Sequence, residues 1–287
     1  MLDCPSWSVF FQLVKVKNKS QLLRFFDPSE LETVQTVPLS SKNPSVASLS
    51  LEKRLEKIHY SWLLPFFESF VEKDKVLLIS SLNNPQKKSL KRHFNLKNSL
   101  FFPKQEAKHY MIDVMYNWVI SIGTGFLPIE FLPDHPLTPL VDLNKKQLEM
   151  LVDYLGLYDL GTELKQIVQS EQIKKIQNVL SKDQKSYLKQ SIYGKQQITF
   201  PRLNLDRWKG DEETLKRVLH HRGFNRLAKA LFGAHPSLLW HIYRQFDTGR
   251  AKVLRRFLTD IKNEEVRLIL IDQILHLIGH IQSMKTK

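Results

Sequence analysis

The sequence predicts an all-α protein whose short helices stack in an armadillo-like right-handed superhelix. Apolar residues recur at helical spacing after residue 50, polar N-cap residues precede many of these runs, and no extensive sheet is expected there. The segment 7–16 fits a strand as well as a helix, so an α+β fold stays open for the N-terminal part. No strict sequence period is present, and a regular repeat array is therefore not expected.

Proline, serine and glycine divide the chain into segments. Four prolines within 128–142 prevent a regular helix and predict a hinge. The full division is an N-terminal segment with a Ser/Pro-rich linker (1–49), a helical domain (50–127), the Pro-rich hinge (128–142), a second helical domain (143–195) and a third (196–287).

The first helical domain begins with Leu51, Leu55 and Ile58 at helical spacing. Pro65 is expected to end or kink that helix, because proline lacks the backbone N–H that a helix interior needs. Pro103 stands where a first-turn proline belongs, before an apolar pattern that extends from residue 107 to residue 118.

Side-chain caps mark the helices of the second domain. Asn144, with a glutamine three residues later, predicts a capping box, and Gly156 is expected to end that helix. Ser170 and Ser181 predict the starts of two further helices by the same reasoning. We therefore expect three short helices in succession.

The third domain has similar signals. Asp211 opens a helix that is expected to end at His220–Arg222, with Gly223 as its left-handed cap. A second apolar run ends at Gly233. Three more helices are predicted after it, and their start signals are Pro236, Asp247 and Asn263. Five consecutive short helices are expected in all.

No catalytic constellation can be constructed from the sequence. It contains no phosphate-binding glycine loop and no nucleophile elbow, and its single cysteine, Cys4, has no histidine context. Asp272, His276 and His280 share one face of the last helix, where they complete an amphipathic pattern rather than predict a metal site. We expect no enzyme, no cofactor and no catalytic, cofactor-binding or metal-ligating residue.

The composition is that of a globular protein, with 42% hydrophobic and 25% charged residues. The most apolar segment, 266–281, contains polar residues and falls short of a membrane-spanning helix. A cytoplasmic protein is expected. Its net charge of +14 favours contact with nucleic acid, an anionic membrane or an acidic protein, although a generally basic proteome would explain the charge equally well.

Two surfaces of the third domain are candidates for partner binding. Trp240 and Arg244 lie one turn apart, off the expected core stripe, and such a pair is typical of a protein-binding hot spot. The alternative is that Trp240 packs on a neighbouring helix, since tryptophan is highly buried on average. Lys252, Arg255 and Arg256 form a basic face, which is either solvated or docks an acidic or phosphate-bearing partner.

A family resemblance adds to these observations. The segment 234–254, Ala-His-Pro-Ser-Leu-Leu-Trp-His-Ile-Tyr-Arg-Gln-Phe-Asp-Thr-Gly-Arg-Ala-Lys-Val-Leu, resembles the signature of the middle domain of the flagellar motor-switch protein FliG. His235 and Pro236 match the centre of the Glu-His-Pro-Gln motif, and Asp247 follows at the family's spacing. Ala234 and Ser237 stand where the family has Glu and Gln.

A helical region around 148–157, Leu-Glu-Met-Leu-Val-Asp-Tyr-Leu-Gly-Leu, is followed by the basic His-Pro segment. In this arrangement the whole chain resembles the K-type accessory proteins (YscK/SctK-like) of type III secretion sorting platforms. This resemblance implies a non-enzymatic, all-helical cytoplasmic adaptor that links the inner-membrane ring to the cytosolic switch-like protein and is held at the membrane through these partners. It also implies that His235 and Pro236 contact the partner. The alternative is a basic helical nucleic-acid-binding protein, suggested by Lys87-Lys88, Lys91-Arg92 and Arg255-Arg256.

Overall fold

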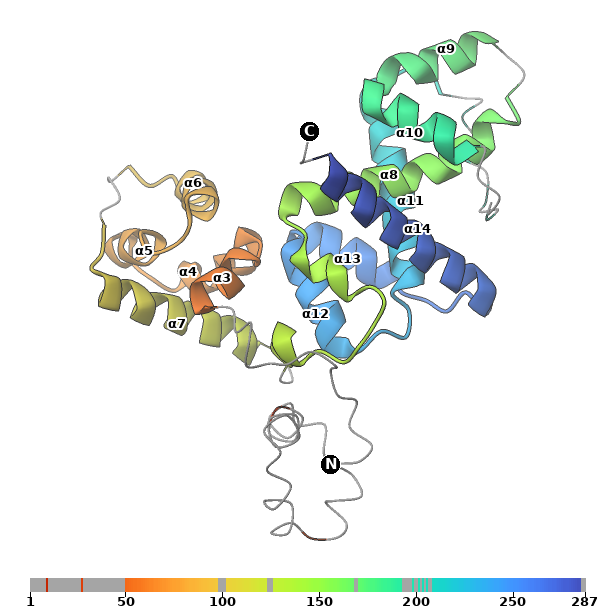
Figure 1. The fold of residues 1–287 in the computed structure, drawn as a ribbon. Helices are drawn as coiled ribbons and strands as arrows, with labels where there is room; N and C mark the ends of the chain where they lie inside the picture. Colours follow the sequence, from red (N-terminus) through yellow and green to blue (C-terminus); the bar gives the residue numbers. More distant parts are fainter. Residues whose placement is uncertain are drawn as a thin grey trace. The chain divides into compact units, whose positions relative to one another are not determined.

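The structure, a computed structural model, describes residues 50–97, 102–122, 126–167, 170–192 and 208–284, with six isolated residues besides. Helices form all of its regular elements, and the described residues include no strand, which confirms the all-α class (Figure 1). The right-handed superhelix stays a prediction. The fold predicted for residues 7–16 lies outside the described residues, and so does the Ser/Pro-rich linker.

The described residues belong to two compact units. Unit 1 comprises those of Met1–Val141 and of Ala234–Ala251, and unit 2 comprises those of Asp142–Gly233 and of Lys252–Lys287. This division differs from the one predicted from the sequence. Helices that the prediction assigned to two domains, 143–195 and 196–287, belong together in unit 2. The segment 234–251 is an exception, because it belongs to unit 1 although the residues before and after it belong to unit 2.

Unit 1 contains short helices around one long helix, α7. Its core includes Phe67, Ile112 and Met115, each with 2% or less of its surface exposed, and α3 packs along α7. The helices before residue 142 are α3 (Leu51–Glu56), η2 (Tyr60–Trp62), α4 (Leu64–Glu68), α5 (Glu72–Ile79), α6 (Asn84–His93), α7 (Gln105–Ser121), η3 (Ile129–Phe131) and η4 (Thr138–Asp142).

The prediction that Pro65 ends or kinks the helix beginning at Leu51 is wrong, whereas Pro103 stands close to its predicted place. Pro65 lies in the first turn of α4, after α3 has ended at Glu56. Pro103 precedes Lys104, the N-cap of α7, so it stands before the helix rather than in its first turn. Each proline therefore lies where the helix does not need its missing N–H.

The proline-rich segment 128–142 contains two 3₁₀ turns and no α-helix among its residues, all of which are described. Leu132, Leu137 and Leu140 are each at most 2% exposed, so the segment buries its apolar side chains although it forms no α-helix. The division between the units falls between Val141 and Asp142, at its end.

Unit 2 is built around two long helices that cross closely. They are α8 (Lys145–Leu164) and α11 (Glu212–Ala230), and the other helices of this part of the chain are α9 (Ser170–Val179), α10 (Lys182–Ile192) and α14 (Glu264–Ser283). Both α10 and α14 pack on α8, and α14 also packs on α11 (Figure 1). Two further helices, α12 (Pro236–Gln245) and α13 (Thr248–Phe257), follow α11 in sequence; α12 belongs to unit 1, and α13 begins there and continues into unit 2.

Two glycines predicted to end helices lie inside them instead. Gly156 is in the interior of α8 and Gly223 in the interior of α11, so the predicted helix ends there are wrong, and α11 replaces two of the five predicted helices. A Cβ on Gly156 would lie 2.1 Å from the Leu219 carbonyl oxygen, and one on Gly223 would lie 1.8 Å from that of Val152. Both glycines are therefore needed for the close approach of the two helix backbones.

The predicted N-caps are confirmed except at Ser170, which is the first residue of α9 rather than its cap. Asn144 and Gln147 form a reciprocal capping box at α8, and the Ser181 hydroxyl accepts a hydrogen bond from the Gln184 N–H before α10. The side chains of Asp211 and Asn263 accept hydrogen bonds from backbone N–H groups in the first turns of α11 and α14. Such caps satisfy amide groups that a helix start leaves unpaired.

A buried ionic network joins three helices of unit 2. The Arg226 guanidinium, on α11, donates from Nε at 2.9 Å and from Nη2 at 2.5 Å to Asp159 Oδ1, on α8. Its Nη1 donates to Gln273 Oε1, on α14, at 2.9 Å. Since Arg226 is 1% exposed, these partners compensate the loss of water around its charge.

Within the described residues, none of the helices combines the length and the apolar character needed to cross a bilayer.

Candidate functional site

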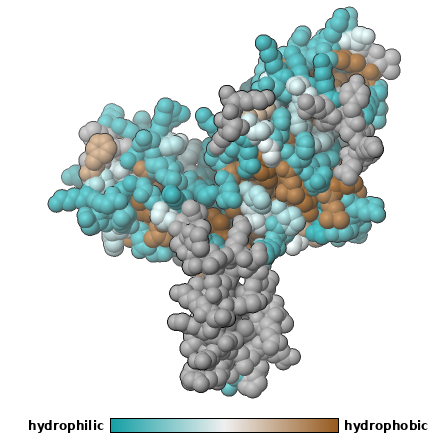
Figure 2. Space-filling view, in the orientation of Figure 1, coloured by the Kyte–Doolittle hydropathy of each residue, from teal (hydrophilic) through white to brown (hydrophobic). Residues whose placement is uncertain are grey.

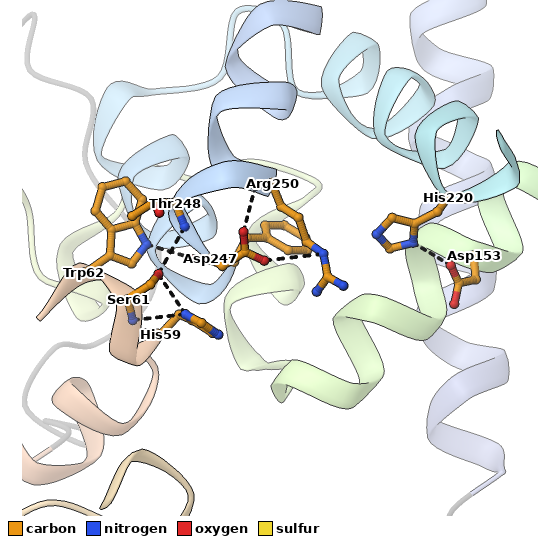
Figure 3. Close-up of polar contacts among 9 residues, drawn as sticks. His59, Ser61, Trp62, Asp153, His220, Asp247, Thr248 and Arg250 are labelled. Atoms are coloured by element: carbon orange, nitrogen blue, oxygen red, sulfur yellow. Dashed lines mark hydrogen bonds and ion pairs between the residues drawn. The ribbon is translucent and has the colours of Figure 1, made fainter. Parts of the chain in front are cut away.

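The segment with the family resemblance is held in unit 1 by hydrogen bonds to η2 and to its N-cap, His59. The His59 N–H donates to the Arg244 carbonyl oxygen at 2.7 Å, and Trp62 Nε1 donates to that of Phe246 at 2.8 Å. The Ser61 hydroxyl accepts a hydrogen bond from the Thr248 N–H at 3.1 Å (Figure 3). The end of α12 and the start of α13 are thereby fixed to residues almost 190 positions earlier in the chain.

Trp240 and Arg244 lie inside this contact, and the expectation that they project from the surface is wrong. Trp240 is 6% exposed and stacks on Phe126 with a centroid distance of 4.7 Å. Arg244 is 5% exposed, and its guanidinium lies 3.9 Å from the Trp62 ring centroid and 5.1 Å from that of Trp240. The alternative interpretation of Trp240 as a packing residue agrees with these contacts. Neither side chain can serve as an exposed anchor in this conformation.

His235 and Pro236 form the start of α12. His235 is the N-cap, and its Nδ1 accepts a hydrogen bond from the Ser237 N–H at 3.2 Å, while Pro236 occupies the first turn and is exposed. Ser237, which replaces the motif's glutamine, is 3% exposed, and its hydroxyl accepts a hydrogen bond from the Leu127 N–H at 3.1 Å. Pro236 is the one exposed residue among the four predicted partner-binding residues of α12 and its N-cap, which are His235, Pro236, Trp240 and Arg244.

A small cavity lies beside α12, inside unit 1. Its volume of about 10 Å³ is room for one water molecule and for no larger ligand. His241, one of the lining residues, donates from Nε2 to the Leu127 carbonyl oxygen at 2.8 Å. Burial is the main reason that the pKa of His241 is lowered to about 4, and the charges of Arg54 and Lys57 contribute. The hydrogen bond to Leu127 and the charge of Glu130 oppose the shift. His241 is therefore neutral at pH 7, and the cavity is a structural feature rather than a substrate site.

The three remaining predicted residues form an exposed basic face in unit 2. Lys252, Arg255 and Arg256 are all exposed, and they lie on the side of α13 opposite Leu254, which is fully buried. The spacing i, i+3, i+4 places the three side chains on one side of the helix. We call Lys252, Arg255 and Arg256 the α13 basic face.

Two residues of α11 extend this face, and the sequence reasoning missed them. His221 contacts the Phe257 ring edge-on at a centroid distance of 4.7 Å, and Arg256 lies over the same ring at 5.3 Å. Burial lowers the pKa of His221, and the nearby charges of Arg256 and Arg222 lower it further. The sequence-based prediction placed His221 and Arg222 at the C-terminal end of a helix. The helix dipole favours cationic residues there, so no functional role was inferred for them. Only the packing of α13 against α11 reveals a shared surface.

Two pairs of polar side chains resemble parts of hydrolytic sites (Figure 3). His59 Nδ1 lies 2.9 Å from the Ser61 hydroxyl, but the same nitrogen accepts the Ser61 backbone N–H as the cap of η2. His220 Nδ1 lies 2.6 Å from Asp153 Oδ1 and joins α11 to α8. The first pair caps a 3₁₀ turn and the second joins two helices of unit 2. Neither forms the chain of nucleophile, base and orienting acid.

No group of three His, Cys, Asp or Glu side chains arranged to hold a metal ion occurs among the described residues. His280, a member of the predicted polar stripe, packs its ring on Tyr187 at 5.0 Å and on Tyr154 at 5.8 Å. Burial lowers the pKa of His280, with a further contribution from His276. Packing and amphipathicity thus explain this stripe.

Comparison of the chain with protein-family models, with curated proteins and with solved structures found no match.

Proposed function

We propose that this protein is a non-enzymatic cytoplasmic adaptor that binds an acidic surface of a protein partner through the α13 basic face. The observation that carries the proposal is the clustering of three exposed cations, Lys252, Arg255 and Arg256, on one side of α13. Cations at the rim of an interface steer an acidic partner and increase the association rate.

The sequence resemblance suggests which assembly the adaptor serves. We infer a type III secretion sorting platform, in which it would link the inner-membrane ring to the cytosolic switch-like protein. Because Trp240 and Arg244 are buried, we assign the proposed contact to the α13 basic face instead of these two residues. Pro236, which lies in the same sequence segment, is exposed as well.

The first experiment identifies the partner. The native protein is purified by affinity under gentle conditions, and co-purifying proteins are identified by mass spectrometry. Recovery of secretion-ring or switch-like components supports the proposed assembly. Recovery of nucleic acid that resists about 0.15 M salt and shows a sequence preference would favour the alternative function.

The second experiment tests the surface. Arg255→Glu with Arg256→Glu reverses two exposed charges and is expected to change the free energy of unfolding by no more than about 0.5 kcal/mol. The affinity for the recovered partner should fall by about tenfold or more, mainly through a lower association rate measured by surface plasmon resonance. The matched control is Lys174→Glu with Lys175→Glu on α9, an exposed pair in the same unit. Equal losses in both variants would show that net charge, not this face, determines binding.

A further inference from the structure

A second basic surface lies in unit 1, on α6. Lys87, Lys88, Lys91 and Arg92 occupy one continuous arc of this helix, opposite the buried Leu90. Lys88 and Arg92 are exposed, and Lys87 and Lys91 are partly exposed. α6 contains no acidic residue at all. We call these four residues the α6 basic face.

This charge pattern opposes the stability of its own helix. Lys87 and Lys91 are four residues apart, as are Lys88 and Arg92, and like charges at this spacing repel each other. Lys91 and Arg92 lie in the last turn, where the helix dipole favours cations, but Lys87 and Lys88 lie in the N-terminal half, where it does not. Local helix stability therefore does not explain the pattern, and features that oppose local stability are typical of functional sites.

The buried side of α6 holds the helix rigidly in place. The Asn83 side chain caps it by accepting the Gln86 N–H at 2.9 Å. The Gln86 side-chain amide donates to the carbonyl oxygens of Leu55 at 2.9 Å and Ile58 at 2.8 Å, and Leu90 is fully buried. The cations are thus presented on a fixed element, which lies at an outer edge of unit 1 (Figure 1).

The neighbouring helices α3 and α7 place an ion pair at the border of the α6 basic face. Burial lowers the pKa of Lys87, and the charge of Lys108 on α7 lowers it further, while Glu52 on α3 raises it. Lys108 is paired with Glu52 at 2.5 Å, which neutralises one cation at the border of the face. Figure 2 shows a mainly hydrophilic surface over this part of unit 1.

The side chains of the face restrict the kind of partner. None of the four is aromatic or apolar, so the face offers neither the anchor of a tight protein interface nor a platform for stacked bases. Three of the four are lysines, which act as mobile point charges rather than as the planar donors that read base edges. Four clustered cations on one helix face suit a fluid layer of anionic headgroups, because lipids can rearrange to match them.

We propose that the α6 basic face binds an anionic lipid bilayer peripherally, through the headgroup phosphates. Each basic side chain near such a surface strengthens binding by about fivefold. Four of them give a weak, reversible attachment that depends on salt, because salt screens charges at the surface. The proposal does not depend on the α13 basic face, which lies in unit 2.

The test is co-sedimentation of the full chain with vesicles of phosphatidylcholine containing about 30 mol % phosphatidylglycerol, at about 0.05 M salt. Binding is expected to these vesicles and not to vesicles of phosphatidylcholine alone, and it should be lost at about 0.5 M salt. Lys88→Gln with Arg92→Gln should weaken binding by roughly 25-fold and leave the melting temperature unchanged. Arg255→Glu with Arg256→Glu should retain most of it.

The control neutralises an equal charge elsewhere, with Lys174→Gln and Lys175→Gln on α9. An equal loss of binding in this control would overturn the proposal, since net charge rather than the α6 basic face would then be responsible. Equal binding to neutral vesicles would overturn it as well. Duplex DNA bound more tightly than the vesicles at the same salt, and lost in the α6 variant, would identify a nucleic acid as the partner instead.

Discussion

Trp240→Ala distinguishes the two interpretations of the α12 segment. The substitution removes a side chain that is 6% exposed, stacks on Phe126 and contacts the Arg244 guanidinium. Truncation of a buried tryptophan to alanine costs about 3–5 kcal/mol, and the lost aromatic pair places this case in the upper part of that range. We therefore expect a loss of about 4 kcal/mol in the free energy of unfolding of unit 1.

Hydrogen–deuterium exchange measured by mass spectrometry can assign this loss to one unit. Peptides from 50–97, 102–122 and 234–251 should exchange faster in Trp240→Ala, while peptides from 142–167 should not change, because local stability differs between cooperative units. Trp240→Phe is the control, since it keeps an aromatic ring beside Phe126; it should cost only roughly 1–2 kcal/mol.

The opposite result would refute the reasoning. If Trp240→Ala lowers the stability of unit 1 by less than about 1 kcal/mol and weakens a partner by about 2 kcal/mol or more, Trp240 is an exposed hot spot in solution. The burial described above would then not represent the working state of the protein.

Two further predictions concern a glycine and a histidine. Gly223→Ala should destabilise unit 2 by at least about 2 kcal/mol, measured by urea denaturation, because its Cβ would lie 1.8 Å from the Val152 oxygen. Gly279→Ala, at an exposed position of α14 where a Cβ meets nothing within 4 Å, should instead stabilise the unit by about 0.5–1 kcal/mol. Equal effects of the two substitutions would contradict the role assigned to Gly223. The depressed pKa of His241, about 4 against about 6.5 when unfolded, means that the unfolded chain binds the proton more readily. The contribution of neutral His241 to the free energy of unfolding is complete above pH 6.5 and is lost as the pH falls toward 4, by roughly 3 kcal/mol in total. His241→Gln should therefore flatten the pH dependence of the urea midpoint between about pH 6.5 and 4. An unchanged pH dependence would show that His241 is not the group responsible.

The sequence by itself determined the helical class and most helix starts. The caps at Asn144, Ser181, Asp211 and Asn263 were predictable because a cap involves residues only two or three positions apart. The α13 basic face was predictable for the same reason, since i, i+3, i+4 spacing fixes a helix face wherever the helix lies. His221 could have been found only by knowing that α11 and α13 pack together.

The tertiary structure decided the meaning of Gly156 and Gly223. Near the end of an apolar run, the sequence does not distinguish a glycine that ends a helix from a glycine that allows a second helix backbone to approach closely. The difference lies in a residue more than 60 positions away, the Leu219 or Val152 carbonyl group that a Cβ would strike.

The tertiary structure alone also assigned the segment 234–251 to unit 1 and buried Trp240 and Arg244 there. The amphipathic pattern of this segment indicates that its apolar face is buried. It does not indicate which helix buries that face, because hydrophobic burial is non-directional. The partner is chosen by shape and by hydrogen bonds such as that from Trp62 Nε1 to the Phe246 carbonyl oxygen, which join residues far apart in the sequence.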